Sequence, residues 1–171
     1  MNTNSAMSFD EPAGAARVVG DGEGKSWWQP VPANGHAEVI LSSTELGSVH
    51  QFSMGRQLVP PGCRVRLHAH DRAEELFYVL NGTGVAEIDG QPHRLFPGVS
   101  LYFGHNRQHT IINDGNEDLQ WLWVFMPGRL EEFFAAIGRE RKPGEPAPEP
   151  FARPADVREI EKRTVFADIT T

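Results

Sequence analysis

GCRVRLHAHDRAEELFYVLNG, residues 62–82, carries the pattern from which the fold of this chain can be predicted. It carries His68-Ala69-His70 in a predicted strand, and Glu75 opens the next strand after a short turn. Alternate residues of a strand face the same side, so the two imidazoles lie about 7 Å apart along one face and can meet one ion. The Glu75 carboxylate comes alongside them. The stretch therefore predicts a metal site built into a β-sheet.

Short strands separated by turn-forming residues surround this stretch, from about residue 37 to residue 127. We predict strands over 37–41, 49–59, 64–70, 76–80, 84–88, 92–96, 100–103, 109–113 and 119–125. The breaks between them are rich in glycine, proline and asparagine. Asp89-Gly90 is a strong hairpin signal, because both residues tolerate a positive φ. So many short strands at close spacing predict a barrel or a sandwich.

A fourth candidate ligand, His109, lies on a later strand, and only a closed sheet would bring it to the same site. Three imidazoles and a carboxylate suit one divalent transition metal ion (Fe, Mn, Ni, Co or Zn) and are too rich in nitrogen for Ca or Mg. Taken alone, the His-X-His pair is as compatible with chance in a surface strand as with metal binding. The metal prediction therefore depends on the whole set of His68, His70, Glu75 and His109.

The flanks differ from the strand region in composition. Residues 1–30 are predicted to be a flexible N-terminal arm, because the first 25 are small, polar and glycine-rich with no hydrophobic period. Residues 31–128 form the predicted barrel. Residues 129–171 are predicted to hold a helix with apolar residues at helical spacing over 130–137, a linker with five prolines over 142–154, and a short closing helix over about 155–163. Residues 139–142 are interpreted as a solvated helix end.

Composition excludes several classes of function. The 171 residues suffice for one ordinary domain, and 17 glycines and 13 prolines favour short strands and turns over long helices. A net charge of −7 without a basic stripe argues against nucleic-acid binding. A single cysteine, Cys63, cannot form an internal disulfide, and no apolar run reaches the roughly 20 residues of a membrane span. The start does not resemble a secretory signal, so we expect a soluble, cytoplasmic protein with no membrane partner.

The spacing of these residues resembles that of a known family. The quoted stretch reads G-X5-HXH-X4-E-X6-G, similar to the first motif of the cupin superfamily, and residues 97–113 read PG-X10-H-X3-N, similar to the second. Two turn positions depart from the family pattern: Val99 replaces an acidic residue, and Gly104-His105-Asn106 replaces Pro-X-Gly. These departures alter loop shape more than ligation.

The resemblance covers about residues 45–137. It implies an all-β protein with a double-stranded β-helix (cupin or jelly-roll) barrel and a short C-terminal helical extension. It also implies that His68, His70, Glu75 and His109 bind one metal ion, and that the chain forms a homodimer. Trp27 and Trp28, just after the loose arm, are the candidate dimer anchors.

Other residues are weaker candidates for the site, and each has a structural alternative. Arg64 and Arg66 share strand parity with the histidines and could hold an anionic substrate by bidentate hydrogen bonds, or lie solvated beyond the barrel mouth. An aromatic stripe could wall a substrate pocket, although such stripes more often form core: Trp121, Trp123 and Phe125. Tyr102 and His50 are conceivable catalytic acid–base groups, with a purely structural role as the alternative.

The resemblance leads us to expect a mononuclear non-haem oxygenase, similar to the metal-dependent cupin dioxygenases, that acts on a small chelating organic molecule. Glu75 is the candidate catalytic proton acceptor as well as a ligand. Two alternatives stay open because this fold hosts several functions. One is a decarboxylase, isomerase or lyase that uses the ion as a Lewis acid, and the other is a non-catalytic cupin that binds a small ligand.

Overall fold

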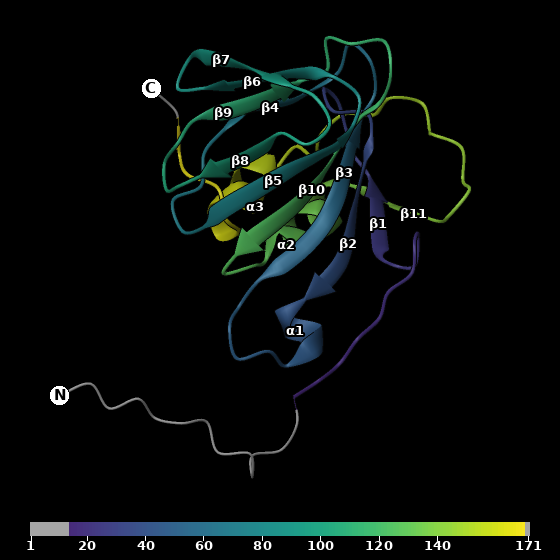
Figure 1. Cartoon of the computed structure of the whole chain (residues 1–171), viewed down its shortest axis with the longest axis vertical. Helices are drawn as coiled ribbons and strands as arrows, with labels where there is room; N and C mark the ends of the chain where they lie inside the picture. The colour runs from purple at the N-terminus through teal and green to yellow at the C-terminus, as the bar shows by residue number, and fades with distance from the viewer. Residues whose placement is uncertain (1–13, 170–171) are drawn as a thin grey trace, which may run out of the picture.

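Two antiparallel sheets lie face to face in the computed structural model, which describes residues 14–169 (Figure 1). The larger sheet contains, in order, β11 (Arg139–Arg141), β1 (Lys25–Trp28), β2 (His36–Ser42), β3 (Ser53–Val59), β10 (Leu119–Met126), β5 (Glu74–Asn81) and β8 (Ser100–Phe103). The smaller sheet contains β4 (Arg64–His68), β9 (His109–Ile112), β6 (Gly84–Ile88) and β7 (Gln91–Leu95). This is the double-stranded β-helix that the family resemblance implied.

The core lies between the sheets and is filled by alternate residues of the strands. On β10 every second side chain is buried, and on β5 the buried positions include Phe77 and Val79. Register places Trp123 of β10 opposite Phe77 of β5, and Phe125 opposite Glu75. Because side chains alternate between the two faces of a strand, the row that carries the aromatic core also carries Glu75 inward.

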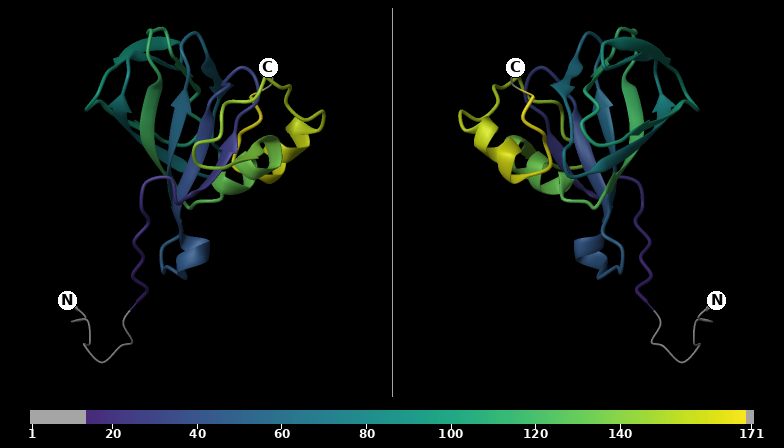
Figure 2. Two further views of the ribbon diagram at one scale, coloured as in Figure 1. Left: turned by 90° about the vertical axis from the view of Figure 1, so that its right-hand side faces the viewer. Right: turned by 90° about the vertical axis from the view of Figure 1, so that its left-hand side faces the viewer.

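The helices lie outside the sheets. After the short α1 (Ser43–Leu46), α2 (Leu130–Ile137) and α3 (Val157–Arg163) follow the barrel and lie beside each other at one side of it (Figure 2). The Phe134 ring packs 5.7 Å from that of Trp123, and the Phe133 ring packs 4.3 Å from that of Phe166, which follows α3. The C-terminal extension thus covers the barrel. Among residues 14–169, no helix has the length and apolar character that a membrane span requires.

All the predicted strands are present, with ends that shift by a few residues, but two strands and a helix were not predicted. β1 lies inside the segment interpreted as a flexible arm, and β11 inside the segment interpreted as a helix end. Both are short and pair with each other, Trp28 opposite Arg139. Their pairing joins residues about 110 apart in the chain, so no local hydrophobic period in the sequence predicts it. Residues 14–24 of the predicted arm form no helix or strand, and residues 1–13 lie outside the described residues.

The two tryptophans proposed as dimer anchors make contacts within their own chain. Trp28 is buried, its ring meets that of His36 edge to face at 5.6 Å, and the Arg141 guanidinium lies 5.1 Å from it. Trp27 packs partly buried against the core. These contacts explain the tryptophans without a second copy, so the homodimer stays an expectation.

Gly55 on β3 is required by a close approach inside the barrel. A Cβ atom there would lie 2.0 Å from the Glu38 carbonyl oxygen and 2.3 Å from the Trp123 ring. We expect Gly55→Ala to lower the free energy of unfolding by about 1–3 kcal/mol, because the packed core must shift. Gly104→Ala is the matched control, since its Cβ would meet nothing closer than 3.7 Å. Urea denaturation measures both, and equal stability of the two variants would contradict the packing argument.

Candidate metal centre

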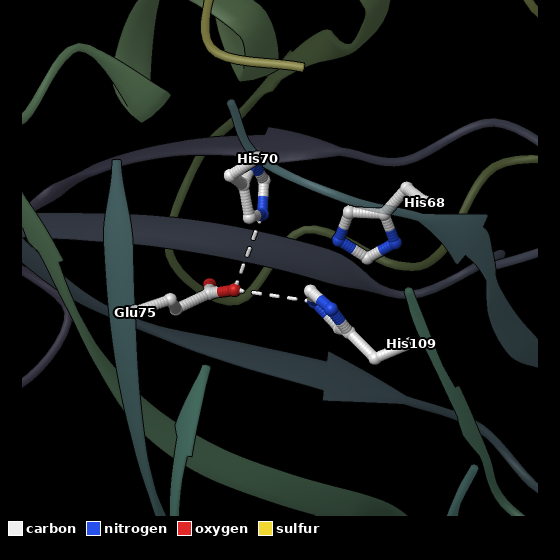
Figure 3. A group of neighbouring side chains, drawn as sticks. All are labelled: His68, His70, Glu75 and His109. Atoms are coloured by element: carbon white, nitrogen blue, oxygen red, sulfur yellow. Dashed lines mark ion pairs between the residues drawn. The ribbon is translucent and has the colours of Figure 1, made fainter. Parts of the chain in front are cut away.

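The four predicted ligands meet between the two sheets (Figure 3). His68 ends β4 and His109 begins β9, and these two residues are register partners in the smaller sheet. His70 follows two residues after His68, beyond the end of β4. Glu75 reaches in from β5 of the larger sheet. Sheet pairing therefore joins two ligands directly, and the facing of the sheets adds the carboxylate.

The ligand atoms are close together and removed from solvent. One donor atom from each residue lies within 4.8 Å of the others. Oε2 of Glu75 is 3.3 Å from Nε2 of His70 and 3.5 Å from Nε2 of His109. The four residues are between 0% and 7% exposed. The Phe103 ring stacks on His109 at 4.0 Å and holds that imidazole in its plane.

A backbone carbonyl fixes the tautomer of each imidazole. Nδ1 of His68 lies 2.8 Å from the Arg66 carbonyl oxygen, and Nδ1 of His109 lies 2.9 Å from that of Arg107. Nδ1 of His70 lies 3.0 Å from the carbonyl oxygen of Val165, which is 95 residues away. A carbonyl can only accept, so each Nδ1 carries the proton and each neutral ring keeps its Nε2 lone pair for the centre.

The unpaired atoms of the cluster fit a cation. Nε2 of His70, Nε2 of His109 and Oε2 of Glu75 are buried and make no hydrogen bond. In the neutral rings all three are acceptors, and buried acceptors that face one another without a donor are costly. A transition metal ion accepts electron pairs from all of them at once. The set of three imidazoles and one carboxylate matches the preference of such ions.

The pKa shifts of two of these residues favour the same assignment. Burial lowers the pKa of His68 well below its usual value, and positive charge on the adjacent His109 and His70 would lower it further. Burial raises the pKa of the Glu75 carboxyl, but protons on the facing Nε2 atoms of His109 and His70 would lower it by more, and a cation between these atoms acts on Glu75 in the same direction. Glu75 is thus a buried carboxylate and His68 a neutral imidazole, the forms in which both bind metal.

A cavity of about 60 Å³ adjoins the cluster and has mostly apolar walls. Among the predicted pocket residues, Trp121 and Arg66 line it. Phe125 is buried, with its ring 4.8 Å from that of His70. Trp123 is fully buried in the core against Phe134 and does not line the cavity.

Three predicted site residues lie away from the cluster, which corrects their assignment. Arg64 is exposed, because the pairing of β4 with β9 is irregular between Val65 and His68 and breaks the expected parity. Tyr102 is 58% exposed, and its hydroxyl donates to Glu74 at 2.7 Å on the outer face of β8. His50 is exposed in the segment that precedes β3. Neither Tyr102 nor His50 lines the cavity.

The sequence analysis missed the contribution of the C-terminal extension to this site. Phe166 lines the cavity, and its ring lies 5.0 Å from that of His70 and 5.4 Å from that of His68. Arg153 also lines it, and Val165 supplies the carbonyl that orients His70. These residues follow the proline-rich linker and carry no motif. Only their docking on the barrel gives them a role.

Comparisons with known proteins agree with the fold. A family model for the cupin domain matches residues 55–125. The oxalate-binding protein of Thermotoga maritima is 35% identical over 71 residues, which are 42% of this chain and 59% of that relative's length. Protein SchB of Streptomyces halstedii is 34% identical over 104 residues, 58% of this chain and 73% of SchB. The crystal structure of a predicted oxalate decarboxylase from Thermotoga maritima superposes with a TM-score of 0.56 at 28% identity, over 64% of this chain and 97% of the other.

The cluster predicts about one transition metal ion per chain in protein purified without chelators, measurable by plasma mass spectrometry. His109→Ala or His68→Ala should remove most of the metal, because each deletes one of the four ligands. His93→Ala is the control, since this histidine is exposed on β7. Full metal content in both ligand variants would exclude the site.

Proposed function

Because this chain belongs to the cupin superfamily and gathers buried acceptors around one point, we propose that it is a metal-dependent enzyme of the mononuclear type. The observation that carries the proposal is the set of unpaired Nε2 and Oε2 atoms beside a largely apolar cavity. A protein that only needed a stable core would fill this position with apolar side chains at lower cost. We infer that the cluster is kept for the ion it binds.

We propose that the reaction is an oxygenation of a small organic molecule that chelates the ion. When bound, the metal would polarise the oxygen atoms of such a substrate and offer O₂ an electron-rich partner. The residues of this chain provide the rest. His68, His70 and His109 hold the ion, and the aromatic walls formed by Trp121, Phe133 and Phe166 keep bulk water away from it.

The size of the cavity favours a small substrate. A single buried water needs roughly 10–15 Å³ of such space, so about 60 Å³ accommodates a few waters or a ligand of a few atoms. Sites for drug-sized ligands are roughly 300–1,000 Å³. We therefore propose a compact oxygen-bearing substrate, with displacement of the covering segment for anything larger.

Glu75 is the proposed proton acceptor. It is the carboxylate of the cluster, and its Oε2 atom lies at the centre of the group. A substrate that enters as a neutral enol or hydroxy compound must lose a proton to chelate strongly. Glu75 would accept that proton, and the three histidines would hold the metal while it does so.

A second candidate is Lewis-acid chemistry without O₂, and the comparisons favour keeping it. The chain is similar to an oxalate-binding protein and to a predicted oxalate decarboxylase. A small dicarboxylate would fit the proposed chelation, and its decarboxylation would use the same four ligands. Binding of such a ligand without turnover is the non-catalytic form of the same hypothesis.

Oxygen consumption separates these functions. Protein loaded with Fe²⁺, Mn²⁺ or Ni²⁺ would be mixed with enolisable diketones, flavonols, hydroxy-acids and oxalate, in air and under nitrogen. We expect substrate loss coupled to O₂ uptake at an oxygen electrode, and none under nitrogen. Equal turnover in both atmospheres would assign the Lewis-acid reaction instead, and tight binding without product would assign a binding protein.

Glu75→Gln separates ligation from catalysis, because glutamine keeps the size and one carbonyl oxygen but loses charge and basicity. If Glu75 is chiefly the base, the rate should fall by roughly 10²–10⁴-fold with most of the metal retained. If it is chiefly a ligand, metal affinity should collapse and excess metal should restore activity. Glu74→Gln is the matched control, since Glu74 accepts its hydrogen bond from Tyr102 outside the cluster. Full metal content and full rate in Glu75→Gln would remove Glu75 from both roles.

A further inference from the structure

Two arginines share one carboxylate beside the metal cavity. Arg66 of β4 and Arg153 of the C-terminal extension each donate through an Nη2 atom to Oε1 of Glu161 on α3, the latter at 2.6 Å. The side chains of the three residues are only 18–27% exposed. One carboxylate oxygen thus serves two guanidinium groups, each of which has five N–H donors and a positive charge. The group carries a net positive charge in a half-buried position.

This group lies in the partition between two spaces. Arg66, Arg153 and Phe166 line the cavity beside the metal ligands, and the same three residues line an outer recess of about 280 Å³. The Arg66 guanidinium carbon lies 5.5 Å from the centre of the Phe166 ring, and that ring in turn lies 5.0 Å from the His70 ring. A molecule that comes through the outer recess therefore reaches the arginines before the metal ligands.

The recess is basic in an acidic protein. Its charged lining side chains are four basic ones against two acidic ones: Arg66, Arg153, Arg158, Lys162, Glu161 and Asp168. The chain as a whole carries −7. A local excess of positive charge in a concave, partly apolar setting attracts small anions, and guanidinium groups match the fork of a carboxylate.

We propose that Arg66 and Arg153 form a subsite for a carboxylate of the substrate, and that Glu161 occupies this subsite when no ligand is bound. The inference rests on the proposed function and names its substrate class: a small organic acid with an acidic group for the arginines and a chelating oxygen group for the metal. The carboxylate of such a molecule takes the place of Glu161 on the guanidinium groups. Glu161 is itself a carboxylate, so the exchange keeps the same hydrogen-bond geometry.

Release of Glu161 would also remove one tie between the barrel and the segment that lines the cavity. Other polar contacts hold the segment from α3 to residue 169 to the barrel. Arg72 donates to the Lys162 carbonyl at 3.0 Å, and Ala167 N–H donates to the Ala69 carbonyl at 2.9 Å. His70 is tied to Val165 in the same segment. Phe166 lines both spaces, so the way from the recess to the metal ligands runs past its ring.

The test compares two ligands that differ only in the remote charge. 2-Oxoglutarate and its 5-amide share the chelating 2-oxo acid, and the amide lacks the second carboxylate. Each would be titrated into Co²⁺-loaded protein, with the dissociation constant taken from the visible absorption of the ion. Glu161→Gln removes the internal competitor. Glu159→Gln is the control, since Glu159 is exposed on the same helix and pairs with Lys162.

We expect Glu161→Gln to bind the diacid about tenfold more tightly than the wild type, with less than a twofold change for the amide and no change in Glu159→Gln. Adding Arg153→Gln to Glu161→Gln should then cut the preference for diacid over amide about tenfold. If Arg66, Arg153 and Glu161 only anchor α3, Glu161→Gln would bind the diacid and the amide with the affinity of the wild type or more weakly than the wild type. Either of those results overturns the subsite.

A separate titration keeps the subsite distinct from the proposed function. If neither 2-oxo acid changes the Co²⁺ spectrum of any variant, metal chelation of such substrates is wrong. Carboxylate binding by Arg66 and Arg153 is then tested by calorimetry of Glu161→Gln with glutarate and its monoamide, which have no 2-oxo group. Preference for glutarate supports the subsite without the metal reaction, and equal or absent binding of the two overturns it.

Discussion

Nε2 of His70 and Nε2 of His109 lie 3.3 Å and 3.5 Å from Oε2 of Glu75, inside a space closed to solvent. Because both rings donate from Nδ1 to a backbone carbonyl, their neutral forms present only acceptors to that oxygen. Such an arrangement is unfavourable without a positive charge at its centre. The strands that hold these side chains therefore do more than fill a core, since they keep mutually repelling groups in contact.

The rigidity of the barrel is what makes this arrangement sustainable. Register between β4 and β9 sets His68 opposite His109, and register between β10 and β5 sets Glu75 on the inner face opposite Phe125. A slip of one residue on β5 would turn Glu75 out to solvent. Gly55, with Trp123 packed against its backbone, shows how tightly the inner face is filled. The cluster thus depends on the same pairings that hold the sheets together.

The C-terminal extension belongs to the site as much as to the surface. It covers the cavity with Phe166 and orients His70 through the Val165 carbonyl. Two of the histidines obtain this orientation from a carbonyl two residues earlier in the chain, but the third depends on a segment 95 residues later. Metal geometry and access to the cavity are consequently linked through one stretch of chain, which is a route by which a bound ligand can affect the ion.

The strands of the barrel, the hairpin turns and three of the ligands could be predicted from the sequence, because each of these features is local. His109, on a later strand, was added by the resemblance of its motif to that of a known family. A period of two marks a strand, Asp-Gly marks a turn, and the spacing of His68, His70 and Glu75 is set within two neighbouring strands. Helix α2 could also be predicted, since its buried residues fall at helical spacing. Each of these signals is carried by residues close together in the chain.

Which other side chains reach the site depends on how distant segments of the chain pack together. Tyr102 and Arg64 were plausible by position, but the outward face of β8 and the irregular pairing of β4 turn them to solvent. No local motif predicted a role for Glu161, Val165 or Phe166. Phe166 lines the cavity, Glu161 lines the outer recess, and the Val165 carbonyl orients a ligand. Strands β1 and β11 were not predicted for the same reason, because they pair with each other although most of the chain lies between them in sequence. Contacts between distant segments depend on how the whole chain packs, and no local pattern of residues encodes that packing.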